Sequence, residues 1–262
     1  MVLPLDQGFE HGPTDFQPNL EALDSTFQFR LALEGRYSAI ALGIGLAEKY
    51  MGDFAGRVPL ILKLNAKTNI PDDSEPVSPL LATVEDAVRL GADAVGYTFY
   101  VGSARQDFEI LQFQKVRSEC ERFGMPILLW SYPRGRAIEA KGGKGTLFAT
   151  DYAARLAEEL GADIVKLHEP QEVNERCPEP YRTMREGLPE RLRRVVRSAG
   201  RCRVLFSGGP KENDATVLRK ADLYLESGAT GVVFGRNLWQ RPYAEALSLS
   251  GRLHRVLARY PR

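Results

Sequence analysis

Cysteine and histidine are scarce in this chain of 262 residues, which has three of each. Cys120, Cys177 and Cys202 are widely spaced and form no CxxC pair, so the sequence predicts free thiols in a reducing compartment rather than disulfides or structural zinc. Catalytic zinc sites need several histidine ligands. Because His254 falls in a C-terminal helical stretch away from the other two histidines, we expect no metal site.

The chain also lacks an excess of charge of either sign and any long apolar run. Its formal net charge is +1, whereas a nucleic-acid surface needs clustered basic residues. The arginines in RLRRVVR (191–197) have acids nearby and are interpreted as a solvated helix face. No apolar run approaches the ~20 residues of a membrane span, and no signal peptide is evident. We therefore expect a cytoplasmic protein with neither nucleic-acid nor membrane partners.

What the sequence does contain is an alternation of short apolar runs with amphipathic stretches. The runs are VLPL (2–5), AIALG (39–43), PLILKL (59–64), AVGYTFY (94–100), PILLWSY (126–132), DIVKL (163–167), RVLFS (203–207) and GVVFG (231–235). Continuous apolar runs are typical of strands covered on both faces. The clearest helices are predicted after the N-cap Thr83 and over 104–123, 149–160 and 212–227, each closed by a glycine.

Eight strand–helix units in about 250 residues predict a single (β/α)8 barrel, an α/β fold with one domain over 1–262. The competing open, doubly wound sheet would carry GxGxxG after its first strand. DQGFEHGP follows the first strand here and lacks that pattern. Because this strand begins at residue 2, we expect no leading segment to cover the bottom of the barrel.

DIVKLHEP, residues 163–170, places Lys166 near the end of a buried strand, where barrel enzymes have their active sites. A lysine in a low-dielectric site has a lowered pKa, so part of it is free amine and condenses with a carbonyl. Alternatively, Asp6 or Glu169 neutralises Lys166 and no chemistry follows. Lys63, on the third strand, is either a second cation that lowers the pKa of Lys166 or the nucleophile itself.

Other strand ends supply candidate partners for such an amine. Tyr132 would transfer protons, or be a hydrogen-bonded rim residue. Asp6 would steer carbinolamine formation or hold a hydroxyl, or only form a turn. His11 would bind phosphate or hydroxyl oxygens, or be an exposed loop histidine.

Glycines after the last two strands predict a phosphate site. SGGP (207–210) and GRN (235–237) offer backbone N–H groups and a short helix start to an anion, with Arg236 beside them. Barrels often bind substrate phosphate at these two loops; the alternative is that the glycines only make tight turns.

The stretch RGRAIEAKGGKGTLF (134–148) is either a lid or an ordinary connection, and four basic residues in it are candidates for a second phosphate: Arg134, Arg136, Lys141 and Lys144.

Seven blocks, in order along nearly the whole chain, resemble the archaeal-type class I fructose-1,6-bisphosphate aldolases, which are related to the DhnA-type proteins. The blocks are LDQGFEHGP (5–13), LILKLN (60–65), GADAVGYTFYVGS (91–103), LLWSYPRG (128–135), DIVKLHEP (163–170), FSGGP (206–210) and VVFGRN (232–237). The resemblance implies a (β/α)8 barrel that cleaves fructose 1,6-bisphosphate reversibly into dihydroxyacetone phosphate and glyceraldehyde 3-phosphate. It also implies a metal-independent lyase that forms homo-oligomers and needs no cofactor beyond the covalent Schiff base.

The resemblance assigns the site residues as well. Lys166 would form the Schiff base, Tyr132 would transfer protons and Asp6 would be an active-site acid. The expected substrate-binding residues are His11, Lys63, Trp130, Arg134, Ser207, Gly208, Gly209, Gly235 and Arg236. Members of the family usually carry a segment before LDQG, and this chain is expected to lack it.

Three alternatives remain at this stage. Related lysine-dependent barrels include a heptulosonate synthase and a thiolase that acts on a sugar phosphate. A non-catalytic sugar-phosphate-binding barrel would keep SGGP and GRN without needing Lys166 or Tyr132, since fold alone does not fix function. Cleavage of fructose 1,6-bisphosphate that EDTA does not inhibit separates the aldolase from the others.

Overall fold

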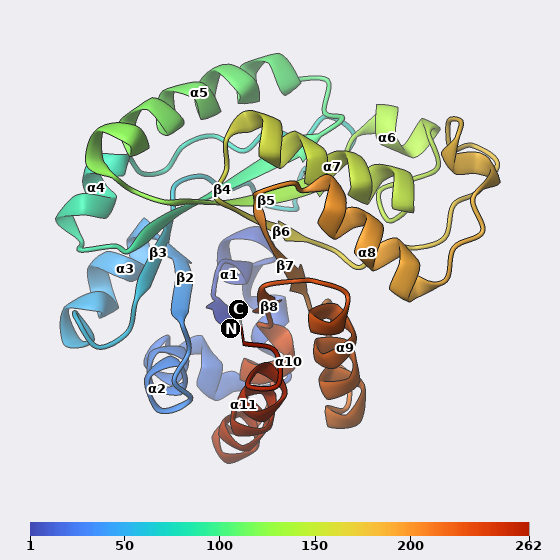
Figure 1. Ribbon diagram of the computed structural model, residues 1–262. Helices are drawn as coiled ribbons and strands as arrows, with labels where there is room; N and C mark the ends of the chain where they lie inside the picture. The colour runs from blue at the N-terminus through green and yellow to red at the C-terminus, as the bar shows by residue number, and fades with distance from the viewer. Residues whose placement is uncertain (262) are drawn as a thin grey trace.

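The computed structural model describes residues 1–261, and within them eight parallel strands close into a barrel, which confirms the predicted (β/α)8 fold (Figure 1). Each strand pairs with the next, and Val2 of the first strand pairs with Val233 of the last. The strands are β1 (Val2–Pro4), β2 (Ala39–Gly43), β3 (Leu60–Lys63), β4 (Ala94–Val101), β5 (Ile127–Pro133), β6 (Ile164–Leu167), β7 (Arg203–Ser207) and β8 (Gly231–Val233).

The predicted runs agree closely with these strands. Those at 39–43 and 203–207 coincide with β2 and β7, and the others differ by one or two residues at an end, where assignments commonly vary because pairing frays.

Helices surround the barrel and connect its strands (Figure 1). They are α1 (Gln7–Glu10), α2 (Thr26–Glu34), α3 (Ile44–Tyr50), α4 (Val84–Arg89), α5 (Gln106–Phe123), α6 (Arg136–Ala140), α7 (Leu147–Leu160), α8 (Leu188–Ser198), α9 (Asp214–Glu226), α10 (Arg236–Trp239) and α11 (Tyr243–Leu257), with 3₁₀ turns η1 (Gly12–Phe16), η2 (Leu20–Leu23), η3 (Met51–Asp53) and η4 (Tyr181–Thr183). None of the helices in residues 1–261 is both long and apolar enough to cross a membrane.

The predicted helix caps explain where several of these helices begin and end. Thr83 and Asp86 exchange side-chain and backbone hydrogen bonds at the start of α4, which satisfies two otherwise unpaired N–H groups. Gly124 and Gly161 close α5 and α7 with left-handed φ values of 64° and 86°, a conformation that glycine adopts without steric cost. The turn into each following strand is therefore encoded locally.

Side-chain alternation along the strands divides the core into two parts. Leu128, Trp130 and Tyr132 of β5 belong to a compact cluster with Ile164, while the intervening Leu129 belongs to the larger cluster that includes apolar helix residues. Alternate residues of a barrel strand point inward. Lys166, two residues after Ile164, therefore points into the barrel rather than toward the helices.

The stretch 134–148 forms α6 and then joins the segment that follows β6. Leu147 N–H donates to the Gln171 carbonyl at 2.9 Å, and Gln171 N–H donates to the Gly145 carbonyl at 2.7 Å. These bonds tie the start of α7 to the chain beyond Lys166.

Candidate active site

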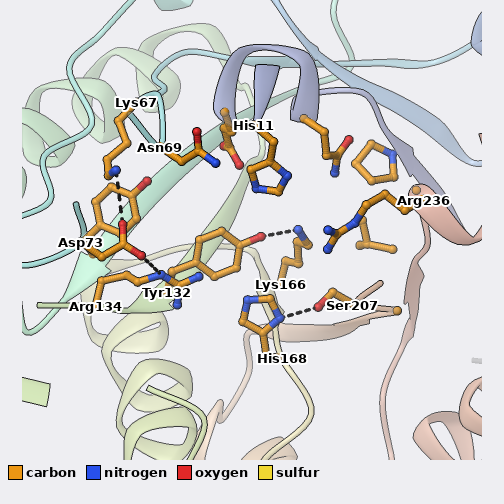
Figure 2. A pocket seen from close by; sticks show the side chains of 18 residues that line it. His11, Lys67, Asn69, Asp73, Tyr132, Arg134, Lys166, His168, Ser207 and Arg236 are labelled. Carbon is orange, nitrogen blue, oxygen red and sulfur yellow. Dashed lines mark hydrogen bonds and ion pairs between the residues drawn. The ribbon is translucent and has the colours of Figure 1, made fainter. Parts of the chain in front are cut away.

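A cavity of about 190 Å³ opens at the carboxyl ends of the strands (Figure 2). Every strand except β2 contributes to it, directly or through the residues that follow it. The lining residues are Pro4, Gln7, Glu10, His11, Lys67, Asn69, Asp73, Tyr100, Tyr132, Arg134, Lys166, His168, Ser207, Gly208, Gly209, Val233, Gly235 and Arg236.

Lys166 lies at the centre of this cavity, and only 5% of it is exposed. Its Nζ donates a hydrogen bond to the hydroxyl of Tyr132 (Figure 2). Burial lowers the pKa of Lys166 to about 8, against the opposing pull of the Asp6 and Glu10 carboxylates. With that pKa, about a tenth of the side chain is free amine at neutral pH, roughly two hundredfold more than for a solvated lysine.

Tyr132 is the closest polar partner of the amine. Its ring stacks on that of His168, with centroids 4.8 Å apart and an interplanar angle of 11°. Burial and then the charges of Glu10 and Asp6 raise its pKa well above the usual value. The free protein therefore holds Tyr132 as a neutral phenol, which can donate its proton.

His168 is held as a neutral imidazole behind Tyr132. Burial, with the positive charge of Lys166 next in importance, lowers its pKa to about 3. Its Nδ1 lies 2.9 Å from the Ser207 hydroxyl, so the imidazole connects β6 to the glycine-containing turn after β7.

Lys63 fits the first of its two predicted roles, that of a second cation, because its charge is one of the causes that lower the pKa of Lys166. Its Nζ lies 2.9 Å from Asp6 Oδ2 and 2.7 Å from Glu10 Oε1, and it does not line the cavity. Burial acts to lower the pKa of Lys63, but the two carboxylates outweigh it and the pKa is raised above the ordinary value. Lys63 therefore stays an ammonium ion, which is not a nucleophile, and its side chain is not part of the cavity wall.

Asp6 and Trp130 also lie outside the cavity wall, because they pack deeper in the barrel. Asp6 is 5% exposed, and its pKa is lowered because the charges of Lys63 and Lys166 outweigh the opposing effect of burial. The Trp130 ring is fully buried, with its centroid 5.0 Å from Lys63 Nζ and 5.5 Å from Lys166 Nζ. Both residues border the two lysines rather than the cavity.

The glycine turns meet at one side of the cavity as expected. Gly208 packs so closely that a Cβ there would lie 2.6 Å from the Phe234 ring, and Gly209 has a left-handed φ of 68°. Small residues are therefore needed for the backbone to follow this path. The helix start predicted after β8 is the single turn α10, with Arg236 at the wall beside Gly235.

His11 lines the cavity near the same side. Its Nδ1 is 2.7 Å from Asp15 Oδ2, and Arg236 Nη1 is 3.9 Å from the same oxygen. Glu169, in contrast, accepts a hydrogen bond from Tyr224 of α9 at 2.8 Å. Glu169 is therefore not the partner of Lys166.

A second group of charges lies on the other side of the Tyr132–Lys166 pair (Figure 2). Asp73 lies 3.2 Å from Arg134 Nε, 3.3 Å from Lys67 Nζ and 3.8 Å from Lys144 Nζ. Arg134 and Lys144 were predicted from the sequence, whereas Lys67, Asn69 and Asp73 were not. They lie in an irregular loop without a motif, and only its position after the carboxyl end of β3 indicates a role.

Glu10 and Tyr100 also line the cavity, although the sequence indicated no specific role for either. Arg136 and Lys141 do not line it. Within residues 1–261, no group of three histidine, cysteine, aspartate or glutamate side chains is arranged to hold a metal ion.

Comparisons with known proteins agree with this geometry. A family model described as DeoC/LacD family aldolase matches residues 1–241. The chain is 38% identical over 242 residues to "Fructose-bisphosphate aldolase class 1" of Thermoproteus tenax, covering 92% of this chain and 83% of the relative. It is 34% identical over 246 residues to the protein of the same name in Halobacterium salinarum, covering 94% and 86%.

A solved structure is similar over nearly the same extent. An archaeal fructose-1,6-bisphosphate aldolase, in which the catalytic lysine is covalently bound to the carbinolamine intermediate of the substrate, superposes with a TM-score of 0.84 and 36% identity. The match covers 98% of this chain and 92% of that one.

Proposed function

The chain belongs to the DeoC/LacD family of aldolases, and from this premise we propose that it is a class I, Schiff-base-forming fructose-bisphosphate aldolase. It is a lyase that cleaves fructose 1,6-bisphosphate reversibly into dihydroxyacetone phosphate and glyceraldehyde 3-phosphate. The observation that carries this proposal is the buried amine of Lys166, whose pKa is lowered to about 8 and which lies against Tyr132 in the cavity. The names of the similar proteins support it.

In the first stage, the free amine of Lys166 adds to C2 of the open-chain ketose and gives a carbinolamine. Tyr132, a neutral phenol, donates its proton to the carbinolamine hydroxyl, which leaves as water. The products are an iminium cation on Lys166 and a phenolate on Tyr132. Each charge stabilises the other in a site where burial would oppose either charge alone.

In the second stage, the phenolate of Tyr132 removes the proton of the C4 hydroxyl. The C3–C4 bond breaks, its electron pair moves toward the iminium nitrogen, and glyceraldehyde 3-phosphate leaves. The remaining enamine is protonated at C3 by Tyr132 and hydrolysed, which releases dihydroxyacetone phosphate and restores the amine. Proton transfer by one positioned group in this way typically contributes 10²–10⁴-fold to a rate.

The two ends of the cavity suit the two phosphates. We assign the phosphate next to C2 to Ser207, Gly208, Gly209, Gly235 and Arg236, with His11 nearby. Arg134, Lys67 and Lys144 surround Asp73 across the cavity and are the candidates for the other phosphate. Asp6 and Lys63 lie beneath the cavity and influence the pKa of Lys166 through their charges. Trp130 packs against both lysines.

The setting of the enzyme is also part of the proposal. Cys120, Cys177 and Cys202 are buried free thiols in the described chain, which is consistent with a reducing cytoplasm. The family resemblance supports a homo-oligomer, and sedimentation analysis of the purified chain would determine the oligomer size.

Cleavage of fructose 1,6-bisphosphate, coupled to detection of triose phosphate, tests the proposed activity. We expect turnover that EDTA does not reduce, and its loss in Lys166→Arg, because a guanidinium keeps the positive charge but does not deprotonate. Lys220→Arg, at a partly exposed lysine of α9 paired with Glu212, is the control. Stabilisation by sugar phosphates without turnover, unchanged in Lys166→Arg, would instead identify a non-catalytic binding protein.

A further inference from the structure

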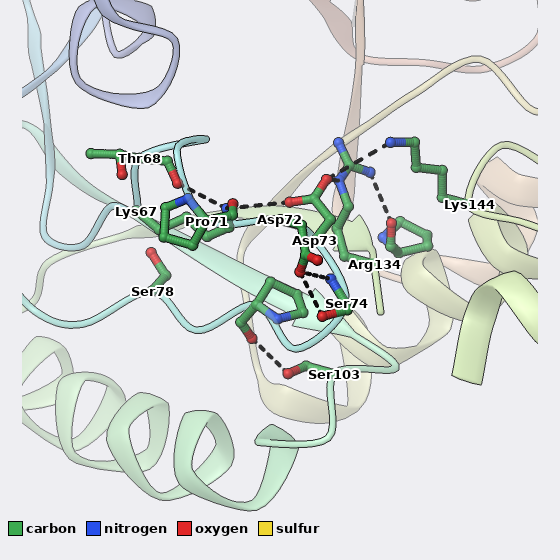
Figure 3. Close-up of polar contacts among 12 residues, drawn as sticks. Lys67, Thr68, Pro71, Asp72, Asp73, Ser74, Ser78, Ser103, Arg134 and Lys144 are labelled. Atoms are coloured by element: carbon green, nitrogen blue, oxygen red, sulfur yellow. Dashed lines mark hydrogen bonds and ion pairs between the residues drawn. The ribbon is translucent and has the colours of Figure 1, made fainter. Parts of the chain in front are cut away.

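The loop between β3 and α4 forms one end of the cavity. It contributes Lys67, Asn69 and Asp73 to the wall, and the Asp73 carboxylate lies 3.2 Å from Arg134 Nε across the opening (Figure 3). The loop has little regular structure of its own, apart from a bridge between Asn65 and Leu80. Its position therefore depends on contacts with the elements behind it.

These contacts converge on Ser78, which is fully buried. Its carbonyl accepts hydrogen bonds from Asn65 Nδ2 at 3.0 Å and from Gln112 Nε2 at 2.9 Å, and its N–H donates to Glu109 Oε1 at 3.0 Å. Two residues earlier, the Pro76 carbonyl accepts a bond from the Ser103 hydroxyl at 2.6 Å (Figure 3). The loop is thus fixed from behind by α5 and by the turn between β4 and α5.

Glu109 is the ionisable member of this set and has no role in the proposed chemistry. It lies in α5 with no exposed surface. Its second oxygen, Oε2, accepts a bond from the backbone N–H of Tyr100 at 2.8 Å, and the Tyr100 side chain is part of the cavity wall. The carboxyl group of Glu109 therefore joins the β3–α4 loop, at Ser78, to β4, at Tyr100.

Backbone N–H groups, not a cation, satisfy both oxygens of this carboxyl group. Burial raises the pKa of Glu109 to about 8, and the two backbone bonds oppose that shift. An apolar or amide side chain would avoid the cost of burying a carboxyl group. An amide, however, offers only one acceptor atom, whereas this position meets two donors.

We propose that Glu109 is a positioning residue that sets the outer, second-phosphate end of the cavity. By holding Ser78 and Tyr100 at a fixed separation, it places Lys67 and Asp73 opposite Arg134. Through that placement it favours substrates with two phosphates over those with one. This inference rests on the proposed aldolase function and extends it to a residue outside the cavity.

Glu109→Gln is the test, because it keeps the size of the side chain and turns an NH₂ group toward one of the two N–H donors. We expect the KM for fructose 1,6-bisphosphate to rise at least tenfold. Borohydride trapping of dihydroxyacetone phosphate, which has one phosphate, should stay within twofold of wild type at Lys166. Glu121→Gln, at an exposed residue of the same helix paired with Arg117, should change neither value.

The two measurements distinguish positioning from a general structural role. A parallel fall in bisphosphate cleavage and in trapping, or no change in either, would overturn the inference, whereas failure of the wild type to cleave the bisphosphate would overturn the proposed function instead. If Glu109→Gln does not fold, Ser103→Ala replaces it. That variant removes the hydroxyl bond to Pro76 without altering a buried ionisable group, and it must raise the same KM while trapping is preserved.

Discussion

Two lysines inside the barrel illustrate how surroundings decide chemistry at the scale of a residue. Lys166 and Lys63 both lie near the ring of Trp130, at 5.5 and 5.0 Å. Lys63 binds two carboxylates and its pKa is raised, whereas Lys166 binds a neutral phenol and its pKa is lowered to about 8. The ion pairs of Lys63 with Asp6 and Glu10 thus keep it protonated, so Lys166 is the lysine that supplies a reactive amine.

Lys63→Met removes the cation between Asp6 and Glu10. We expect the free energy of unfolding to fall by about 3–5 kcal/mol, because a buried carboxylate is left without its partner. The pKa of Lys166 should rise, since both carboxylates then act on it alone, so its trapping at pH 7 should slow. Urea unfolding and trapping rates measure the two effects. Equal stability of Lys63→Met and the control Lys220→Met, at a partly exposed lysine, would contradict this account.

Tyr132→Phe separates Schiff-base formation from bond cleavage. The proton transfers lose their donor and acceptor, so kcat for bisphosphate cleavage should fall about 10²–10⁴-fold. The amine of Lys166 remains, and trapping of added dihydroxyacetone phosphate should persist at a reduced rate. Steady-state kinetics and mass analysis of the reduced adduct provide the comparison. A variant that keeps more than a third of the wild-type kcat would remove Tyr132 from the mechanism.

Sequence patterns predicted which residues gather at the site. They predicted less well how far below the cavity wall each side chain lies. Strand position indicated Lys166 and Tyr132, and both line the cavity. Lys63 also points inward, but its side chain reaches Asp6 and Glu10 beneath the wall. Strand periodicity gives the direction of a side chain, whereas its depth depends on neighbours that are distant in sequence.

At the scale of elements, the strands under the site pack without spare volume. Gly96 on β4 lies beside Trp130 and Lys63, and a Cβ there would come within 2.7 Å of the Trp130 ring and 3.0 Å of Lys63 Cγ. Glycine here allows two large interior side chains to fit beneath the cavity.

Gly96→Ala should therefore destabilise the fold by about 1–3 kcal/mol through overpacking. It should also lower activity, because Trp130 and Lys63 must shift. Gly45→Ala is the matched control, since that glycine is exposed in α3 with nothing within 4 Å of the new methyl group, and it should be neutral or stabilising by about 0.5–1 kcal/mol. Thermal unfolding of both variants tests the contrast, which fails if Gly96→Ala is as stable as wild type.

Element prediction succeeded where a periodic pattern or a cap was present. The helices bounded by Thr83, Gly124 and Gly161 begin or end as their caps indicate. The single turns α1 and α6, and the loop that carries Asp73, were missed. One helical turn is too short to show periodicity, and an irregular loop is positioned by distant groups such as Glu109.

At the scale of the whole molecule, closure of the barrel joins the two ends of the sheet through β1 and β8. The prediction of the fold from eight strand–helix units succeeded because this count and length fit few other architectures. We also propose that the chain is one domain, since Trp130 in β5 and Trp239 in α10 both lie in the buried core of the same closed barrel.

A single domain should unfold as a unit. Tryptophan fluorescence and far-ultraviolet circular dichroism should then report the same urea midpoint, within the error of the fits. Separate midpoints would indicate that part of the barrel unfolds independently. An oligomer would shift both midpoints together with protein concentration.

The measurement that tests the central claim most directly is the pH dependence of borohydride trapping with dihydroxyacetone phosphate, with the modified lysine located by peptide mapping. Only the unprotonated amine adds to a carbonyl, so the rate should rise about tenfold per pH unit and level off above pH 8, with the adduct on Lys166. A rate that continues to rise beyond pH 10, as for a solvated lysine, or an adduct on Lys63, would contradict the account.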